Sequence, residues 1–164
     1  MPDEKPSAVG IDSCILIELF DEKSPTRDDI RQIVADAESG KLTLLISAMV
    51  FAEVAANSKN LDAWDIAEVR RALSQSYFEP VELSIPMAIL ASDIARENGL
   101  KPADAIHAAT CVSKRVSYLL TTDKKPLKAS GKIPLDATNR SKTLQIITPE
   151  SFCDQFYRPL FKQS

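Results

Sequence analysis

The chain has 164 residues, of which 45% are hydrophobic and 26% are charged, and its net charge at pH 7 is −3. This length and balance are typical of one globular domain, so we expect residues 1–164 to form a single α/β unit. The apolar runs are too short to cross a bilayer and the N-terminus shows no signal peptide, which predicts a cytoplasmic protein with no membrane partner.

Strands and helices alternate through the first half of the chain. Residues 1–7 are mostly polar and are expected to form a flexible tail. Hydrophobic periodicity and cap residues then predict the following elements: a strand over 8–11, a helix that Asp12 and Ser13 cap and that ends near Asp21, a helix over 27–39, a strand over 42–47, a helix from Ser47 through Glu53 to about residue 57, and a helix from Asp62 to about Ser76.

The same alternation continues through the second half. It predicts a strand over 81–83, a helix from Ser84 to Asn98 that stops at Gly99, a helix from Pro102 to Arg115, a strand over 118–122, a long basic loop over 124–143, a strand over 144–147 and a terminal helix from Thr148. This order favours a three-layer α/β/α fold with a central parallel sheet of four to five strands.

Four acidic residues lie where a strand stops or a helix starts. Asp12 and Asp123 directly follow predicted strands. Asp104 lies in the first turn of a helix, and Glu53 lies on the helix that follows another strand. In an open parallel sheet these places converge outside the carboxyl ends of the strands. Four carboxylates there would repel one another unless a cation neutralised them, so the pattern predicts a divalent-metal site.

The metal ligands would have to be oxygen atoms. The chain has one histidine, His107, and no C-x-x-C pair, and the cysteines at 14, 111 and 153 are expected to be buried thiols in a reducing compartment. Oxygen ligands favour Mg²⁺ or Mn²⁺, and such ions typically promote hydrolysis of phosphoryl esters. No phosphate-cradling glycine loop is present. Ser13, Thr121 and Thr122 are the expected supporting hydroxyls.

Each of these residues also has an ordinary structural explanation. Asp104 alone is more often a helix-start stabiliser than a ligand, Glu53 alone a surface charge and Asp123 alone a turn residue. His107 is expected to be a hydrogen-bonded structural residue and not a base. The segment 124–143 holds six basic residues and one acid, so Lys124, Lys125 and Lys128 are candidate contacts for a polyanion, or the segment is merely a soluble connection.

The four acids lie in the segments GIDSCILIELF, SAMVFAEV, KPADAIHAAT and LLTTDKK. Together these segments resemble the PIN-domain family of metal-dependent ribonucleases, which includes the VapC toxins of toxin–antitoxin pairs. The resemblance implies a three-layer fold, an acidic Mg²⁺ or Mn²⁺ pocket and endonucleolytic cleavage of RNA. It also implies that Asp12, Glu53, Asp104 and Asp123 are the four acids of the pocket, and that an antitoxin protein is a possible partner.

Two other functions compete with a metal-dependent endoribonuclease. One is a PIN-like module that binds RNA or a protein with little or no catalysis. The other is a phosphatase with Asp12 as nucleophile, which is disfavoured because Cys14 stands where a D-x-D arrangement needs its second acid. A homodimer is a further hypothesis, with Met49, Val50, Phe51 and the aromatic terminal helix as a candidate face.

Overall fold

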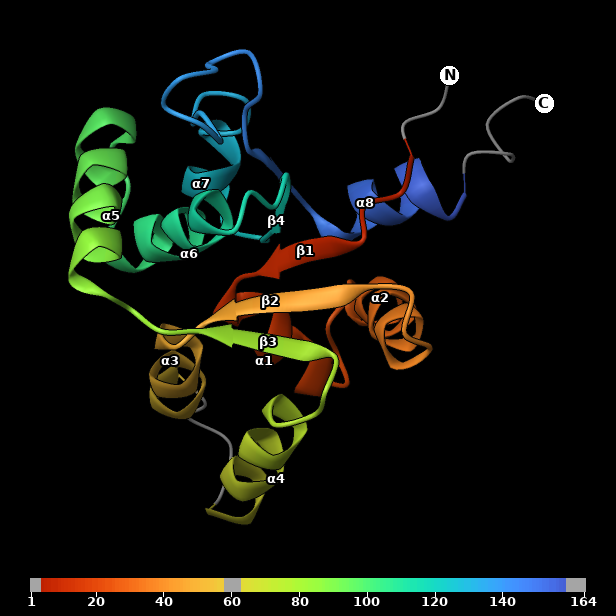
Figure 1. The fold of residues 1–164 in the computed structure, drawn as a ribbon. Helices are drawn as coiled ribbons and strands as arrows, with labels where there is room; N and C mark the ends of the chain where they lie inside the picture. The colour runs from red at the N-terminus through yellow and green to blue at the C-terminus, as the bar shows by residue number, and fades with distance from the viewer. Residues whose placement is uncertain (1–3, 58–62, 159–164) are drawn as a thin grey trace.

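A five-stranded parallel sheet lies at the centre of the protein (Figure 1). The structure is a computed structural model that describes residues 4–57 and 63–158. The strands follow the order β3-β2-β1-β4-β5 across the sheet, and every neighbouring pair is parallel. Their bounds are Ala8–Ile11 for β1, Thr43–Ser47 for β2, Phe78–Val81 for β3, Tyr118–Leu120 for β4 and Gln145–Ile147 for β5.

Helices connect these strands and cover both faces of the sheet (Figure 1). They are α1 (Ser13–Phe20), α2 (Arg27–Glu38), α3 (Met49–Asn57), α4 (Ala63–Leu73), α5 (Ile85–Asn98), α6 (Pro102–Ser113), α7 (Lys124–Lys128) and α8 (Pro149–Phe156). Most of the helix ends follow the predicted local signals. Ser84 accepts a hydrogen bond from the Met87 amide at the start of α5, and Gly99 ends that helix with a left-handed φ of 64°.

The alternation of side chains along each strand divides the core into two halves. In β2, Leu44 and Ile46 pack with α1, α2, α3, α4 and α8, whereas Leu45 packs on the opposite face with α5 and α6. In β4, Leu120 and Leu119 divide in the same way. This is the period of two that a strand buried on both faces requires. The predicted three-layer α/β/α fold is therefore confirmed.

The strand β3 begins three residues earlier than predicted. It was expected over 81–83 but spans Phe78–Val81 and includes Pro80. Proline lacks the N–H that a central strand needs, so the sequence pattern placed the strand after it. Because β3 lies at the edge of the sheet and pairs only with β2, Pro80 fits without breaking a second ladder.

A long surface loop was expected over the basic segment 124–143, but the structure shows a segment that is packed on the fold. It begins with α7, and an antiparallel bridge joins Pro134 to Thr143. Ile133 and Leu135 are buried with the α5 and α6 side chains. The segment is therefore packed on the fold, with its basic side chains projecting from an ordered base.

Residues 4–7 are attached to the body of the protein, although a flexible tail over 1–7 was expected. Lys5 pairs with Asp36 at 2.5 Å, and the Tyr157 hydroxyl donates to the same carboxylate at 2.9 Å. The Thr43 amide donates to the Ser7 carbonyl. Residues 1–3 and the predicted cap Asp62 lie outside the described residues.

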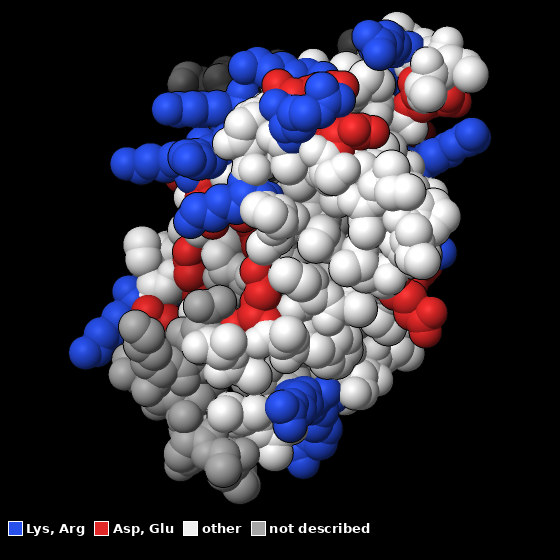
Figure 2. Space-filling model, turned by 90° about the vertical axis from the view of Figure 1, so that its left-hand side faces the viewer, with Lys and Arg blue, Asp and Glu red and all other residues white. Residues whose placement is uncertain are grey.

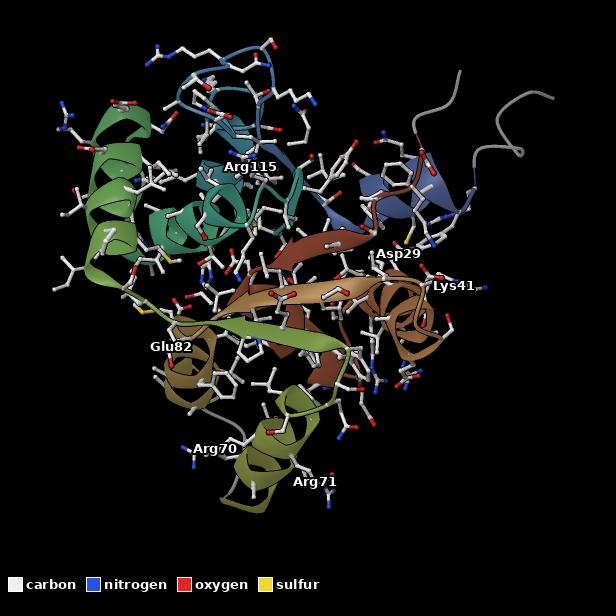
Figure 3. All side chains as sticks on the ribbon, in the orientation of Figure 1. Asp29, Lys41, Arg70, Arg71, Glu82 and Arg115 are labelled. Carbon is white, nitrogen blue, oxygen red and sulfur yellow. The ribbon has the colours of Figure 1, made fainter. Side chains whose placement is uncertain are left out.

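Helices α2 and α8 are joined through side chains. Asp29 of α2, which is labelled in Figure 3, pairs with Arg158, which follows α8. Phe152 in α8 is fully buried, as is Val50 in α3. Of the face suggested for a homodimer, Val50 and Phe152 therefore belong to the core, whereas Met49, Phe51 and Phe156 are partly buried. Within the described residues, none of the helices combines the length and the apolar character needed to cross a membrane.

Gly10 sets the distance between β1 and α6. A Cβ atom at this position would lie 2.1 Å from the Cys111 Sγ of α6. We expect Gly10→Ala to lower the free energy of unfolding by about 1–3 kcal/mol, because overpacking forces the backbone or side chains to shift. Urea unfolding of Gly10→Ala, Cys111→Ala and the double variant measures the coupling. Cys111→Ala should recover part of the loss, and an equal loss in both backgrounds would contradict the close approach.

Candidate metal centre

The carboxyl ends of the parallel strands form one face of the molecule. The arrowheads of the strands in Figure 1 point towards the side that faces the viewer in Figure 2. On this face, Figure 2 shows acidic side chains gathered in a depression, with Lys and Arg side chains along one side of it. The residues that follow β1 and β4 and those that begin α6 and α7 supply this region.

Asp12 is the central acid of the site. It follows β1, and its amide donates to the Leu120 carbonyl, which ties it to β4. Although Asp12 occupies the N-cap position of α1, its side chain makes no capping bond. Instead, Oδ2 accepts from the Thr121 hydroxyl at 2.7 Å, and Oδ1 accepts from the Ser13 hydroxyl at 3.3 Å. Asp12 is 4% exposed, so the direction of its side chain is fixed by buried contacts.

The two threonines after β4 have different contacts. The Thr121 hydroxyl donates to Asp12 and accepts from the Asp123 amide at 3.1 Å, so it joins both acids. The Thr122 hydroxyl donates to Glu18 at 2.6 Å. Glu18 in turn accepts from the Thr26 hydroxyl, which connects the end of β4 to the turn before α2. Thr122 is therefore directed towards α1, while Thr121 is directed towards the acids.

Asp12, Asp104 and Asp123 form a group of three carboxylates. One oxygen of each lies within 4.8 Å of the others. Burial raises the pKa of Asp104, and the charges of Asp12 and Asp123 raise it further, against a smaller lowering by His107 and Lys101. These three acids come from three places in the fold: the start of α1, the first turn of α6 and the start of α7.

Glu53 belongs to a second group, with Asp12 and His107. Its Oε2 lies 2.7 Å from His107 Nε2, and the same nitrogen lies 3.4 Å from Asp12 Oδ1. Burial raises the pKa of Glu53, but the hydrogen bond and charge of His107, together with the Ser13 hydroxyl, lower it by more. The structure therefore groups Glu53 with Asp12 but not with Asp104 and Asp123, and Asp12 belongs to both groups.

His107 has a larger part in this region than the sequence indicated. Burial lowers its pKa, but the hydrogen bond to Glu53 and the charges of Asp12, Glu53 and Asp104 outweigh this effect and raise it. Its position three residues after Asp104 places both side chains on one side of α6. That spacing is the signal from which its place beside the acids could have been inferred.

An open cavity of about 490 Å³ lies beside the aspartates. We call it the acidic hollow, and its lining residues are Lys101, Asp104, Thr122, Asp123, Lys124, Lys125 and Pro126. Lys101, at the N-cap of α6, was not identified from the sequence. Of the three lysines that were, Lys124 and Lys125 line the hollow, whereas Lys128 lies in the last turn of α7, outside the lining.

The donor set fits a divalent cation that prefers oxygen. Three carboxylates of three separate elements meet beside an open cavity, and the raised pKa of Asp104 reflects their mutual repulsion as well as burial. Mg²⁺ and Mn²⁺ take few protein carboxylates and keep their remaining positions for water or phosphate oxygens, which the open side of this group allows.

Comparison with known proteins places the chain in a family. Residues 9–132 match the family model of the PIN domain. Among curated proteins, none matches the sequence. A toxin–antitoxin complex from Klebsiella pneumoniae is similar in structure, with 26% identity, a TM-score of 0.60 and coverage of 86% of this chain and 97% of that chain. The sarcin-ricin-loop-cleaving toxin VapC20 from Mycobacterium tuberculosis has a TM-score of 0.63 over 74% of this chain and 94% of its own, and at 12% identity it shows the shared fold alone. Since the family match covers most of the sequence and includes all four acids, the chain belongs to the PIN-domain family.

Proposed function

We propose that the protein is a Mg²⁺- or Mn²⁺-dependent endoribonuclease that hydrolyses RNA phosphodiester bonds. The observation that carries this proposal is the meeting of Asp12, Asp104 and Asp123 within 4.8 Å of one another beside a hollow that lysines also line. Such a site suits a phosphate substrate, because the carboxylates hold a cation and the lysines pair with phosphate oxygens. Membership of the PIN-domain family supports the same reaction.

The residues of the site have different roles in the proposed reaction. Asp12, Asp104 and Asp123 would hold the cation, and Glu53 would complete the acidic region beside Asp12. When bound, such a cation supplies charge stabilisation to the phosphoryl oxygens and makes water a stronger nucleophile. Thr121 and Ser13 fix the Asp12 carboxylate through their hydroxyls, so its oxygens are oriented before the substrate arrives.

The lysines of the acidic hollow would hold the RNA backbone. Lys101 lies on one side of Asp104, and Lys124 and Lys125 follow Asp123. Phosphates on either side of the bond to be cleaved would pair with these side chains, which position the substrate without reading its sequence. Lys128 is outside the lining and would contact RNA further along the strand.

We also propose that the protein acts in the cytoplasm as the toxin of a toxin–antitoxin pair, with an antitoxin protein as its partner. The similarity to a chain of a toxin–antitoxin complex, at 26% identity over most of both chains, supports this role.

The Asp12→Asn variant tests the reaction. It keeps the size of the side chain and removes the carboxylate that both groups of acids share. Cleavage of a fluorescently labelled RNA should therefore fall by at least about 100-fold, a larger loss than is typical for a residue that only orients a metal ligand. Wild type should cleave with Mn²⁺ or Mg²⁺ and stop with EDTA. The matched control is Asp28→Asn, which alters an acid in the first turn of α2. Full activity of Asp12→Asn would exclude the assigned site, and RNA binding by wild type without turnover would favour the binding module.

The lysines of the hollow predict a change in the salt dependence of RNA binding. In the Asp12→Asn background, Lys101→Ala and Lys124→Ala should each reduce the slope of log affinity against log salt by about 0.7 for each phosphate that is no longer neutralised. Fluorescence anisotropy with a single-stranded RNA measures the slope. Lys41→Ala is the control, since Figure 3 places Lys41 at the end of β2 that lies away from the acidic hollow. Unchanged slopes for both hollow variants would show that RNA follows another path.

Burial of Asp104 and its repulsion by Asp12 and Asp123 predict an increase in stability for Asp104→Asn. Its raised pKa means that the folded protein disfavours the ionised form, so metal-free stability falls as pH rises through the ordinary carboxyl pKa towards the raised one. Because Asp104 is only partly buried, solvent screening limits the gain of Asp104→Asn at pH 7 to about 1 kcal/mol, a rise in Tm of roughly 2–4 °C.

Thermal unfolding with and without Mn²⁺ completes this test. Mn²⁺ should raise the Tm of wild type and have little effect on Asp104→Asn, because a ligand stabilises the state that binds it. Asp28→Asn should lose a little stability, since it removes an acid from the start of a helix, where the helix dipole favours a negative charge. A lower metal-free Tm for Asp104→Asn would contradict the predicted repulsion.

A further inference from the structure

His107 contacts acids from two other elements through one nitrogen. It lies on α6 and is 2% exposed. Its Nε2 is 2.7 Å from Glu53 Oε2 on α3 and 3.4 Å from Asp12 Oδ1 after β1. The shorter distance is that of a charge-assisted hydrogen bond. A single ring nitrogen therefore lies close to both acidic side chains.

The other ring nitrogen shows which role His107 can take. Nδ1 is buried and has no hydrogen-bond partner among the described residues. A histidine that binds a metal almost always donates its second N–H to a carboxylate or carbonyl, which fixes the ring and increases its basicity. If Nε2 bound a metal, His107 would carry a buried N–H at Nδ1 that no described residue accepts, and such a group is costly.

A proton on Nε2 removes this difficulty. In the neutral form with the proton on Nε2, the ring donates to Glu53 and leaves only a lone pair at Nδ1. The doubly protonated ring also donates from Nε2, but it carries an N–H at Nδ1 that no described residue accepts. Both forms give the same contact with Glu53, so the contact does not depend on the charge of the ring.

We propose that His107 is a positioning residue, whose Nε2–H holds Glu53 beside Asp12 and outside the group formed by Asp12, Asp104 and Asp123. The inference rests on the proposed function, since it concerns how the cation of that reaction is held. It makes the cation site a cluster of three aspartates, with Glu53 as an outer carboxylate. Asp12 keeps its two hydroxyl donors, Thr121 on Oδ2 and Ser13 on Oδ1, and the His107 ring nitrogen lies 3.4 Å from Oδ1.

A spectroscopic measurement distinguishes His107 as a hydrogen-bond donor to Glu53 from His107 as a direct metal ligand. Pulsed electron paramagnetic resonance of Mn²⁺-loaded wild type detects a directly coordinated imidazole nitrogen through its ¹⁴N coupling. We expect no such coupling. Its presence would identify His107, the only histidine in the chain, as a ligand and would overturn the proposal.

Two substitutions separate the hydrogen bond from the bulk of the side chain. His107→Leu keeps much of the volume and removes the donor, and we expect it to weaken Mn²⁺ binding by about 10–100-fold, as loss of an outer partner does. His107→Gln keeps an N–H donor and should bind Mn²⁺ close to wild type. In a Glu53→Ala background, His107→Leu should lose most of its effect, because its partner is absent.

Mn²⁺ affinity is measured by titration calorimetry on the full chain, with thermal unfolding of each variant as a check on folding. Equal affinities for wild type and His107→Leu would overturn the proposal, as would His107→Gln binding as weakly as His107→Leu. If a variant fails to fold, the ¹⁴N measurement on wild type still decides between donor and ligand. Wild type that binds no Mn²⁺ would overturn the metal centre itself, and wild type that binds Mn²⁺ without cleaving RNA would overturn only the nuclease.

Discussion

Repulsion among carboxylates that cannot move apart is the constraint on which this structure depends. Two unit charges about 4 Å apart near a protein surface repel by on the order of 4 kcal/mol. Asp12, Asp104 and Asp123 are held at comparable separations by three different elements. The Asp12 backbone is bonded to β4, and Asp104 is carried by a helix whose neighbouring residues are buried. Relief of the repulsion by movement would therefore disrupt the close-packed core, whereas the proposed cation would relieve it without such movement.

Helix α6 connects this electrostatic constraint to the packing of the sheet. It carries Asp104 and His107 towards the acids, and its Ala105, Ala108 and Ala109 are completely buried. Small residues on the helix and Gly10 on β1 allow the two elements to lie close together. A shift of α6 along or away from the sheet would displace two groups of the site at once. Close packing and the geometry of the acids are therefore properties of the same interface.

Local patterns in the sequence predicted most of the fold. Strands buried on both faces, the helix stop at Gly99 and the serine cap at Ser84 are signals that act within a few residues, and the structure contains each of them. The offset of β3 and the short helix α7 were missed because neighbours distant in the sequence decide them. An edge position makes Pro80 acceptable in a strand, and burial of Ile133 orders the segment after α7.

The site shows the same difference between local signals and contacts that join residues distant in the sequence. Three acids at strand ends or helix starts could be expected to meet, because parallel topology brings those points together. The contact of Glu53 with His107 joins residues 54 positions apart and depends on the rotation of two helices, which periodicity alone does not determine. Thr121 and Thr122 are neighbours with opposite directions, so only the structure distinguishes the one that reaches Asp12 from the one that reaches Glu18.

Pro80 has a consequence for how other proteins can approach this molecule. Unpaired edge strands invite a foreign strand to extend the sheet through main-chain hydrogen bonds, both in regulated complexes and in aggregation. The strand β3 is short, and its residues Glu79 and Pro80 are exposed. Pro80 has no backbone N–H that a foreign strand could bind. Continuous strand addition along β3 is thus disfavoured by the covalent structure of the chain, so a partner at this edge would have to recognise side chains instead of the backbone.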